Sequence, residues 1–223
     1  MKRYIVNLSA TAEFMIVIVV AFGYMLIASF LAIIEPNPEP PISPARLWSL
    51  IVFESTILVT LSWILRLRGW TLQVLGLAPS VRETFAGLGL AVAAYAATLV
   101  TWTIVESVGP GLVQSARQTY LVSPGLNVVT VVAVATVNPV FEEVFVCGYI
   151  VAALRRNGQL WTGVISSVGL RLFYHLYQGA GAISILPIGL LFAFCYAWSG
   201  RLWPVIVAHA IVDVFGLIQY VGD

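Results

Sequence analysis

Seven ionisable side chains lie within apolar stretches of the sequence, and both histidines of the protein are among them: Glu54, Glu142, Glu143, Arg171, His175, His209 and Asp213. If these stretches cross a membrane, an ionised carboxylate at the bilayer centre costs about 2.5–3.5 kcal/mol even on insertion scales. Polar contacts between membrane helices contribute only about 0.6 kcal/mol on average, so they are a poor reason to retain seven such groups. We therefore interpret the set as a functional site.

The spacing of these residues divides most of them into pairs. Arg171 and His175 are four residues apart, and so are His209 and Asp213, so each pair lies on one helix face. The two adjacent glutamates differ by about 100° around their helix, so only one can point directly at a common centre. We expect these three pairs to face one another around a small wet cavity. Glu54 has no local partner, and we interpret it as structural, with an arginine as one candidate partner.

These residue types favour the activation of water. A buried glutamate can take a proton from water, and a histidine can orient that water or share its proton. The second histidine and its neighbour could face the charge that develops on a carbonyl oxygen. A protein nucleophile is less suitable: Ser166 and Ser167 precede His175 by more than two helical turns, and the carboxylates near Cys147 disfavour its thiolate.

A metal ion or a proton relay would use the same residue types. Zinc accepts histidine and carboxylate ligands, and the candidate ligands are Glu142, His175 and His209. The sequence has no His-Glu-x-x-His motif, and we favour no cofactor. Chains of Asp, Glu and His also form the proton relays of transporters, although no internal repeat typical of transporters is evident. Zinc binding and proton-coupled transport therefore stay as alternatives to water activation without a metal.

The composition predicts an all-α, polytopic helical membrane protein surrounded by a lipid bilayer. Hydrophobic residues make up 60% of the chain and charged residues only 9%, whereas soluble domains contain about 25% charged residues. The net charge of +1 says nothing about nucleic acid, but the sequence has no basic patch, so we expect no nucleic-acid partner. Cys147 and Cys195 both lie in apolar runs, so we expect buried thiols rather than a disulfide or a metal pair.

Hydropathy and helix-breaking residues predict seven transmembrane helices, with the polar site between three of them. The expected helices are residues 14–34, 47–65, 84–105, 128–154, 160–177, 183–198 and 202–220. Residues 1–82 would then hold the first two helices and a linker, and residues 83–223 the other five. Pro139 is expected to kink the fourth helix or to split off its first part. Residues 109–125 are expected to form a loop.

The basic residues divide unevenly between the two sides of this arrangement. With the N-terminus in the cytoplasm, only Arg46 and Arg117 lie outside, and the cytoplasmic residues are Lys2, Arg3, Arg66, Arg68, Arg82, Arg155, Arg156 and Arg201. Such asymmetry indicates that the basic side is cytoplasmic. The first apolar run is long enough to span the membrane and is not followed by a small-residue cleavage site, so we expect it to be retained as a helix.

The ordered polar motifs resemble the CPBP family, also called the Abi family, of CAAX prenyl endopeptidases and bacteriocin-processing intramembrane proteases. The family pattern is Glu-Glu-x-x-x-Arg, then Phe-x-x-x-His, then His-x-x-x-Asn or Asp. The matching residues here are Glu142-Glu143, then His175, then His209 and Asp213. The resemblance covers a core of about residues 128–216, and residues 68–77 resemble the family's preceding segment.

Two positions depart from the family pattern in a complementary way. Cys147 stands where the first motif has arginine, and Arg171 stands where the second motif has phenylalanine. We interpret this as relocation of one cation from the fourth helix to the fifth, from which it could give electrostatic support to both glutamates. The last position is the acid Asp213, which would oppose an oxyanion directly, so we expect it to orient His209.

The resemblance implies an intramembrane endopeptidase in a prokaryotic cell membrane that acts on a membrane-associated peptide or protein. In this assignment Glu142 and His175 activate water, His209 with Asp213 stabilises the tetrahedral oxyanion, and Glu143 holds the site electrostatically. A non-catalytic peptide-binding or bacteriocin-immunity protein with the same cavity is an alternative.

Overall fold

Helices form nearly all of the regular structure, which confirms the all-α prediction. A computed structural model describes residues 7–35, 42–119 and 122–222, apart from the side chains of residues 115–119. Within these ranges, extended segments pair only at an isolated bridge between Ile42 and Val122. The helices are α2 (Ala10–Ile34), α3 (Pro44–Arg66), α4 (Val81–Val108), α5 (Pro110–Thr119), α6 (Val128–Glu142), the π-helix η1 (Glu143–Val151), α7 (Ala152–Arg156), α8 (Leu160–Tyr174), the 3₁₀-helix η2 (Leu176–Ser184), α9 (Ile185–Ser199) and α10 (Trp203–Ile218).

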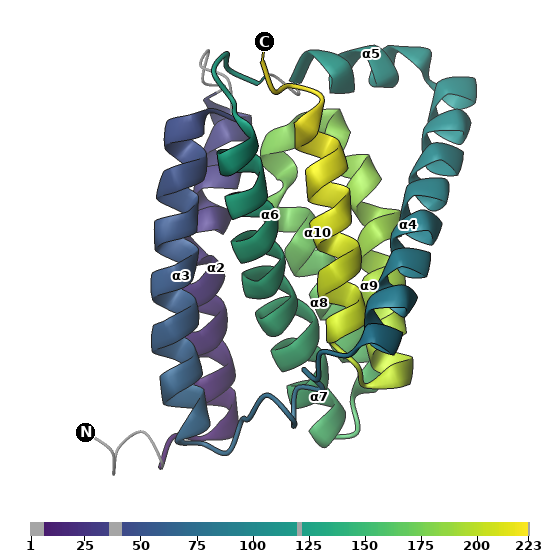
Figure 1. The fold of residues 1–223 in the computed structure, drawn as a ribbon. Coiled ribbons are helices and arrows are strands. Elements are labelled where there is room, and N and C mark those ends of the chain that lie inside the picture. The colour runs from purple at the N-terminus through teal and green to yellow at the C-terminus, as the bar shows by residue number, and fades with distance from the viewer. Residues whose placement is uncertain (1–6, 36–41, 120–121, 223) are drawn as a thin grey trace.

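Five helical stretches of the described chain are long and apolar enough to cross a membrane: Ala10–Ile34, Pro44–Arg66, Val81–Val108, Val128–Arg156 and Leu176–Ser199. They confirm a polytopic membrane protein. The other two predicted spans correspond to α8, with 15 residues, and α10, with 16. Both run alongside the longer helices in Figure 1. The total of seven crossings stays a prediction, because these two helices are shorter than a typical span of about 20 residues.

The centre of the bundle is one continuous helix, Val128–Arg156, which comprises α6, η1 and α7. Pro139 lies inside α6 without dividing it. The main irregularity follows Glu142, where the helix widens into the nine-residue π-helix η1, all of whose residues are buried. Such π-helical turns are rare and frequently occur at functional sites.

Residues 110–119 form helix α5, so the prediction of a loop over residues 109–125 is wrong for this part. Gly109 ends α4, and its N–H donates to the carbonyl oxygen of Val105 at 2.8 Å. Pro110 then begins α5, because its fixed φ and missing N–H suit the first position of a helix. The Gly-Pro pair therefore separates two helices. In Figure 1, α5 lies across the end of the bundle at which the C-terminus is found.

The predicted fifth helix, 160–177, ends earlier than expected. α8 stops at Tyr174, and His175 caps it with φ −100° and ψ 2°. The chain continues as η2, in which Gly179 has a φ of 55°, a value that is readily accessible only to glycine. His175 thus lies at a break between two helices, where its backbone departs from the helical path.

A polar cluster fixes the linker between α3 and α4 to the rest of the bundle. Glu13, in the first turn of α2, accepts hydrogen bonds from Trp70 Nε1 and from the Tyr149 hydroxyl, each at 2.8 Å, and it also pairs with Arg68. The Arg156 guanidinium lies over the Trp70 ring, 3.7 Å from its centroid. These contacts join α2, the linker and η1, so they help to hold the helix that carries the adjacent glutamates.

The arginines at the helix ends give a testable orientation. Helices α3, α7 and α9 end, and α4 begins, at the same end of the bundle (Figure 1). Six arginines lie in or next to these helix ends: Arg66, Arg68, Arg82, Arg155, Arg156 and Arg201. Arg46 lies in the first turn of α3, at the other end of the bundle. Lys2 and Arg3 lie outside the described residues.

We expect the linker residue Gln73 to face the cytoplasm and Gln219 to face outward. Single cysteines at these exposed positions, introduced into a Cys195→Ala background in which only the buried Cys147 remains, would be probed with a membrane-impermeant maleimide. Gln219→Cys should react in intact cells, and Gln73→Cys only after permeabilisation. The parent without an added cysteine is the control, and reaction of both positions from the same side contradicts this topology.

Candidate active site

The junction of α6 and η1 places the two adjacent glutamates inside the bundle. Glu142 is 3% exposed and Glu143 is fully buried. Glu142 lines a cavity of about 2190 Å³, whose walls come mainly from apolar residues of α2, α3, α4, α9 and α10. Glu143 does not line this cavity. The neighbouring carboxylates therefore have different surroundings, as their angular separation on a helix predicts.

Arg171, on α8, bridges the two carboxylates. Its Nη1 lies 3.2 Å from Glu142 Oε2, and its Nη2 lies 2.7 Å from Glu143 Oε1. All three side chains are buried. One guanidinium thus compensates two adjacent negative groups from across the bundle, which is the placement required by the hypothesis of a relocated arginine.

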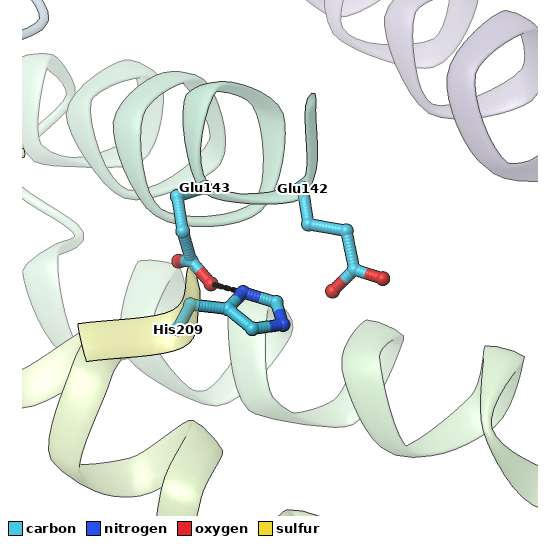
Figure 2. Close-up of side chains that lie close together, drawn as sticks. All are labelled: Glu142, Glu143 and His209. Carbon is cyan, nitrogen blue, oxygen red and sulfur yellow. Dashed lines mark hydrogen bonds and ion pairs between the residues drawn. The ribbon is translucent and has the colours of Figure 1, made fainter. Parts of the chain in front are cut away.

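His209, on α10, contacts Glu143 more closely than it contacts Asp213. Its Nδ1 lies 2.6 Å from Glu143 Oε1, whereas its Nε2 lies 3.5 Å from Asp213 Oδ1. Figure 2 shows the His209 ring directed at Glu143, with the Glu142 carboxylate on the other side of the ring. The expected His209–Asp213 pair is present, but the shorter contact to Glu143 had no signal in the sequence, because it joins residues 66 positions apart.

His175 lines the same cavity as Glu142, but it does not contact the glutamates directly through Nδ1. That nitrogen lies 2.8 Å from the backbone carbonyl oxygen of Arg171. A carbonyl oxygen can only accept a hydrogen bond, so Nδ1 carries the hydrogen in this contact. In the neutral ring Nε2 then has a free lone pair, and it can accept a proton.

Two residues not expected from the sequence complete the surroundings of Glu142. The Tyr174 hydroxyl donates to Glu142 Oε2 at 2.5 Å, and Asn138 Nδ2 donates to Glu142 Oε1 at 3.2 Å. The four-residue spacing from Asn138 to Glu142 is a helical signal that could have identified the asparagine. Tyr174 had no such signal, because it reaches Glu142 from another helix.

Glu54 is also connected to this site. Asn138 Nδ2 donates to Glu54 Oε1 at 2.7 Å, and Glu54, on α3, is fully buried. Among the described residues Glu54 forms no ion pair. The candidate arginine partner is thus not found among the described residues, and the described partner is an amide on the neighbouring helix.

The space around Arg171 is shaped by two small residues. Cys147 Sγ lies 4.0 Å from Arg171 Nη2, so the guanidinium reaches the position from which the family's first motif would supply its own arginine. On α9, a Cβ added at Gly189 would lie 3.3 Å from Arg171 Cδ, closer than most Cβ contacts. Cysteine at 147 and glycine at 189 together leave room for a long side chain from α8.

A metal ion would have to compete with Arg171. Carboxylate oxygens of Glu142 and Glu143 and a ring nitrogen of His209 lie within 4.8 Å of one another, which is a spacing that could hold an ion. The predicted ligand His175 is not part of this group. Both carboxylates already contact the guanidinium, and His209 Nδ1 faces Glu143. The residues therefore fit a metal poorly unless Arg171 moves away.

A family model described as Type II CAAX prenyl endopeptidase Rce1-like matches residues 124–215. This match confirms the resemblance to the CPBP family. The Rce1-like region extends from the residues preceding α6 into α10, and it contains every site residue described above except Glu54. Comparisons with curated proteins and with solved structures gave no match. The matched residues, which are less than half of the chain, are therefore similar to a family of prenyl endopeptidases.

Replacing Arg171 should reveal whether one cation has been relocated. We expect Arg171→Leu to lower the melting temperature and to abolish peptide cleavage, because breaking a buried ion pair from one side typically costs about 3–5 kcal/mol. The double variant Arg171→Phe with Cys147→Arg should have a higher melting temperature and a higher cleavage rate than the sum of the two single effects predicts. The measurements are thermal unfolding in detergent and peptide cleavage.

The matched control is Arg201→Leu, because Arg201 pairs with Glu83 but its side chain is 52% exposed. An exposed ion pair contributes little to stability, so the melting temperature and cleavage rate of this variant should remain near those of the wild type. Simple additivity of the Arg171→Phe and Cys147→Arg effects would show that the two positions do not exchange one charge.

Proposed function

We propose that the chain is an intramembrane endopeptidase that hydrolyses a peptide bond with water activated by Glu142 and His175. The observation that carries this proposal is the meeting of Glu142, His175 and His209 at one large cavity between membrane helices. The match of this region to an endopeptidase family supports the same reaction class.

In the proposed reaction, Glu142 and His175 hold the water that attacks the substrate carbonyl carbon. Arg171 and Tyr174 both donate to Glu142 Oε2, and they hold the carboxylate in place. Among the described residues Oε1 accepts only from Asn138, so it can accept a further hydrogen bond and orient the water. His175 Nε2 has the free lone pair, and it takes the proton as the new C–O bond forms. The same proton then passes to the substrate nitrogen as the C–N bond breaks.

His209 is proposed to stabilise the negative charge on the carbonyl oxygen. Glu143 accepts from Nδ1 at 2.6 Å and so fixes the plane of the ring. Because Nδ1 donates to Glu143, Nε2 carries a hydrogen only in the doubly protonated ring, and we propose this form for His209, which faces two carboxylates. Its Nε2–H, 3.5 Å from Asp213 Oδ1, can then donate to the substrate oxygen. Arg171 keeps the two carboxylates from repelling the developing oxyanion. Glu143 and Asp213 act through His209 in this proposal, and Glu142, His175 and His209 face the substrate.

The expected substrate is a peptide or protein segment associated with the membrane. The cavity, at about 2190 Å³, exceeds the 300–1,000 Å³ typical of small-molecule pockets, and its mostly apolar walls suit a lipid-linked or hydrophobic segment. A prenylated peptide is the class named by the matched family, and we propose it as the first to test. The location in a prokaryotic cell membrane stays a prediction.

Cleavage of a peptide panel tests the proposed function. Purified protein in detergent would be incubated with internally quenched peptides, including farnesylated peptides with a C-terminal CAAX sequence, and products would be identified by mass spectrometry. We expect cleavage by the wild type and a loss of about 10²–10⁴-fold in kcat for Glu142→Gln and for His175→Gln. Glu106→Gln, which changes an exposed glutamate of α4, is the matched control. A folded wild type that cleaves no peptide would favour non-catalytic peptide binding or proton-coupled transport.

Catalysis is expected to proceed without a bound metal. Arg171 already places a positive charge against both carboxylates that a metal would need as ligands. Elemental analysis of the active protein should therefore show zinc well below one atom per chain, and incubation with 1,10-phenanthroline should leave the cleavage rate unchanged. Stoichiometric zinc that is lost together with activity, and restored with it, would overturn this expectation.

A further inference from the structure

The amide of Asn138 is held between two carboxyl groups. Its Nδ2 lies 3.2 Å from Glu142 Oε1 on one side and 2.7 Å from Glu54 Oε1 on the other. An amide nitrogen has two hydrogens, so both are used by these contacts. Turning the amide over would place its oxygen against the Glu142 carboxylate, which pairs with Arg171 and can only accept, so this contact fixes which end of the amide is the nitrogen.

The fixed orientation leaves the amide oxygen for the cavity. Asn138 lines the cavity. Its Oδ1 accepts no hydrogen bond from the described residues, and it is not among the buried polar atoms that lack a partner. Around Glu142 the neighbouring side-chain groups are mainly donors, from Arg171 and Tyr174. An extended peptide presents backbone N–H groups as well as carbonyl groups, so it needs an acceptor near the scissile bond.

The described structure shows no role for Glu54 other than its hydrogen bond with Asn138. It lies outside the cavity lining, it is fully buried, and its Oε2 has no hydrogen-bond partner among the described residues. Leaving a buried acceptor unpaired is unfavourable by about 1–3 kcal/mol. Its one described hydrogen bond, to Asn138, is what a residue that positions the amide would make.

We propose that Asn138 binds the substrate backbone, with Oδ1 accepting a hydrogen bond from a peptide N–H, and that Glu54 is the residue that positions its amide. This inference rests on the proposed function, because it assigns a substrate contact to the same cavity. Asn138 contacts the substrate, whereas Glu54 acts only through Asn138.

The test compares KM and kcat for four variants with the best-cleaved peptide of the panel. Glu54→Leu should raise KM about tenfold with kcat nearly unchanged, because it loosens a binding contact and leaves the contacts of Arg171 and Tyr174 to Glu142 in place. Glu54→Gln keeps an acceptor oxygen at this position, so its KM should stay within about twofold of wild type. Asn138→Ala should also raise KM about tenfold, and it should lower kcat because Glu142 loses a donor.

The double variant Glu54→Leu with Asn138→Ala decides whether Glu54 acts through the amide. Its KM should equal that of Asn138→Ala alone, since residues that act as one unit are not additive. The matched control is Thr130→Val, which changes another buried polar residue of α6 whose side chain contacts Asn127 and lies away from the cavity. The proposal would be overturned if Glu54→Leu raised KM by the same factor in the wild type and in Asn138→Ala. An unchanged KM in Asn138→Ala would also overturn it. If Glu54→Leu does not fold, Asn138→Ala alone decides.

Failure of the proposed function gives a different result. If the wild type cleaves no peptide, the intact fluorescent farnesylated peptide can be used directly for equilibrium binding by anisotropy. The same tenfold pattern in Kd would then support the role of Asn138 in a non-catalytic protein, and equal Kd values across the variants would overturn it. A wild type that neither binds nor cleaves the peptide would overturn both proposals.

Discussion

The structure depends on the neutralisation of two adjacent carboxylates at membrane depth. Glu142 and Glu143 are both buried, and ionised groups there are unfavourable unless they are paired and hydrogen-bonded. Three of their four oxygens have partners: Asn138 at one, Arg171 with Tyr174 at the second, and Arg171 with His209 at the third. Glu143 Oε2 has none among the described residues. These partners come from α6, α8 and α10, so satisfying the two charges also determines how three helices must meet.

The same constraint gives the two glutamates different environments. Glu143 is enclosed and pairs with Arg171 and His209, whereas Glu142 borders the cavity. The helix changes to π-helical pitch between them, and the buried π-helix leaves no exposed position to which Glu143 could turn. A substrate in the cavity could therefore reach Glu142 without contacting Glu143. This separation is why we assign the chemistry to Glu142 and the orientation of His209 to Glu143.

Features that depend on local pattern were predictable from the sequence, and features that depend on contacts between distant segments were not. The apolar stretches, the polar pairs at four-residue spacing and the ordered family motifs are local, and they gave the helical class and most residues of the site. The Glu143–His209 contact, the Tyr174 hydroxyl on Glu142 and the amide that joins Glu54 to the site all depend on how helices pack. The loop prediction failed at Pro110 because a helix-breaking pair can equally begin the next helix. His175 was placed inside a helix because its neighbours are apolar, yet the chain breaks there before η2.

The position of Arg171 shows that this kind of site constrains the location of a charge in space more strongly than its place in the sequence. Comparison of the motifs alone suggests that the first motif has lost its cation, because Cys147 stands at the position of its arginine. Yet the guanidinium of Arg171 lies 4.0 Å from Cys147 Sγ and contacts both glutamates. Glycine at 189 provides the room for its stem on the side of α9. The electrostatic energy of a carboxylate pair in a low-dielectric interior depends on the distance to the nearest cation. It does not depend on which helix supplies that cation. Sequence departures at such sites are therefore better judged by whether the charge is retained than by whether the motif is.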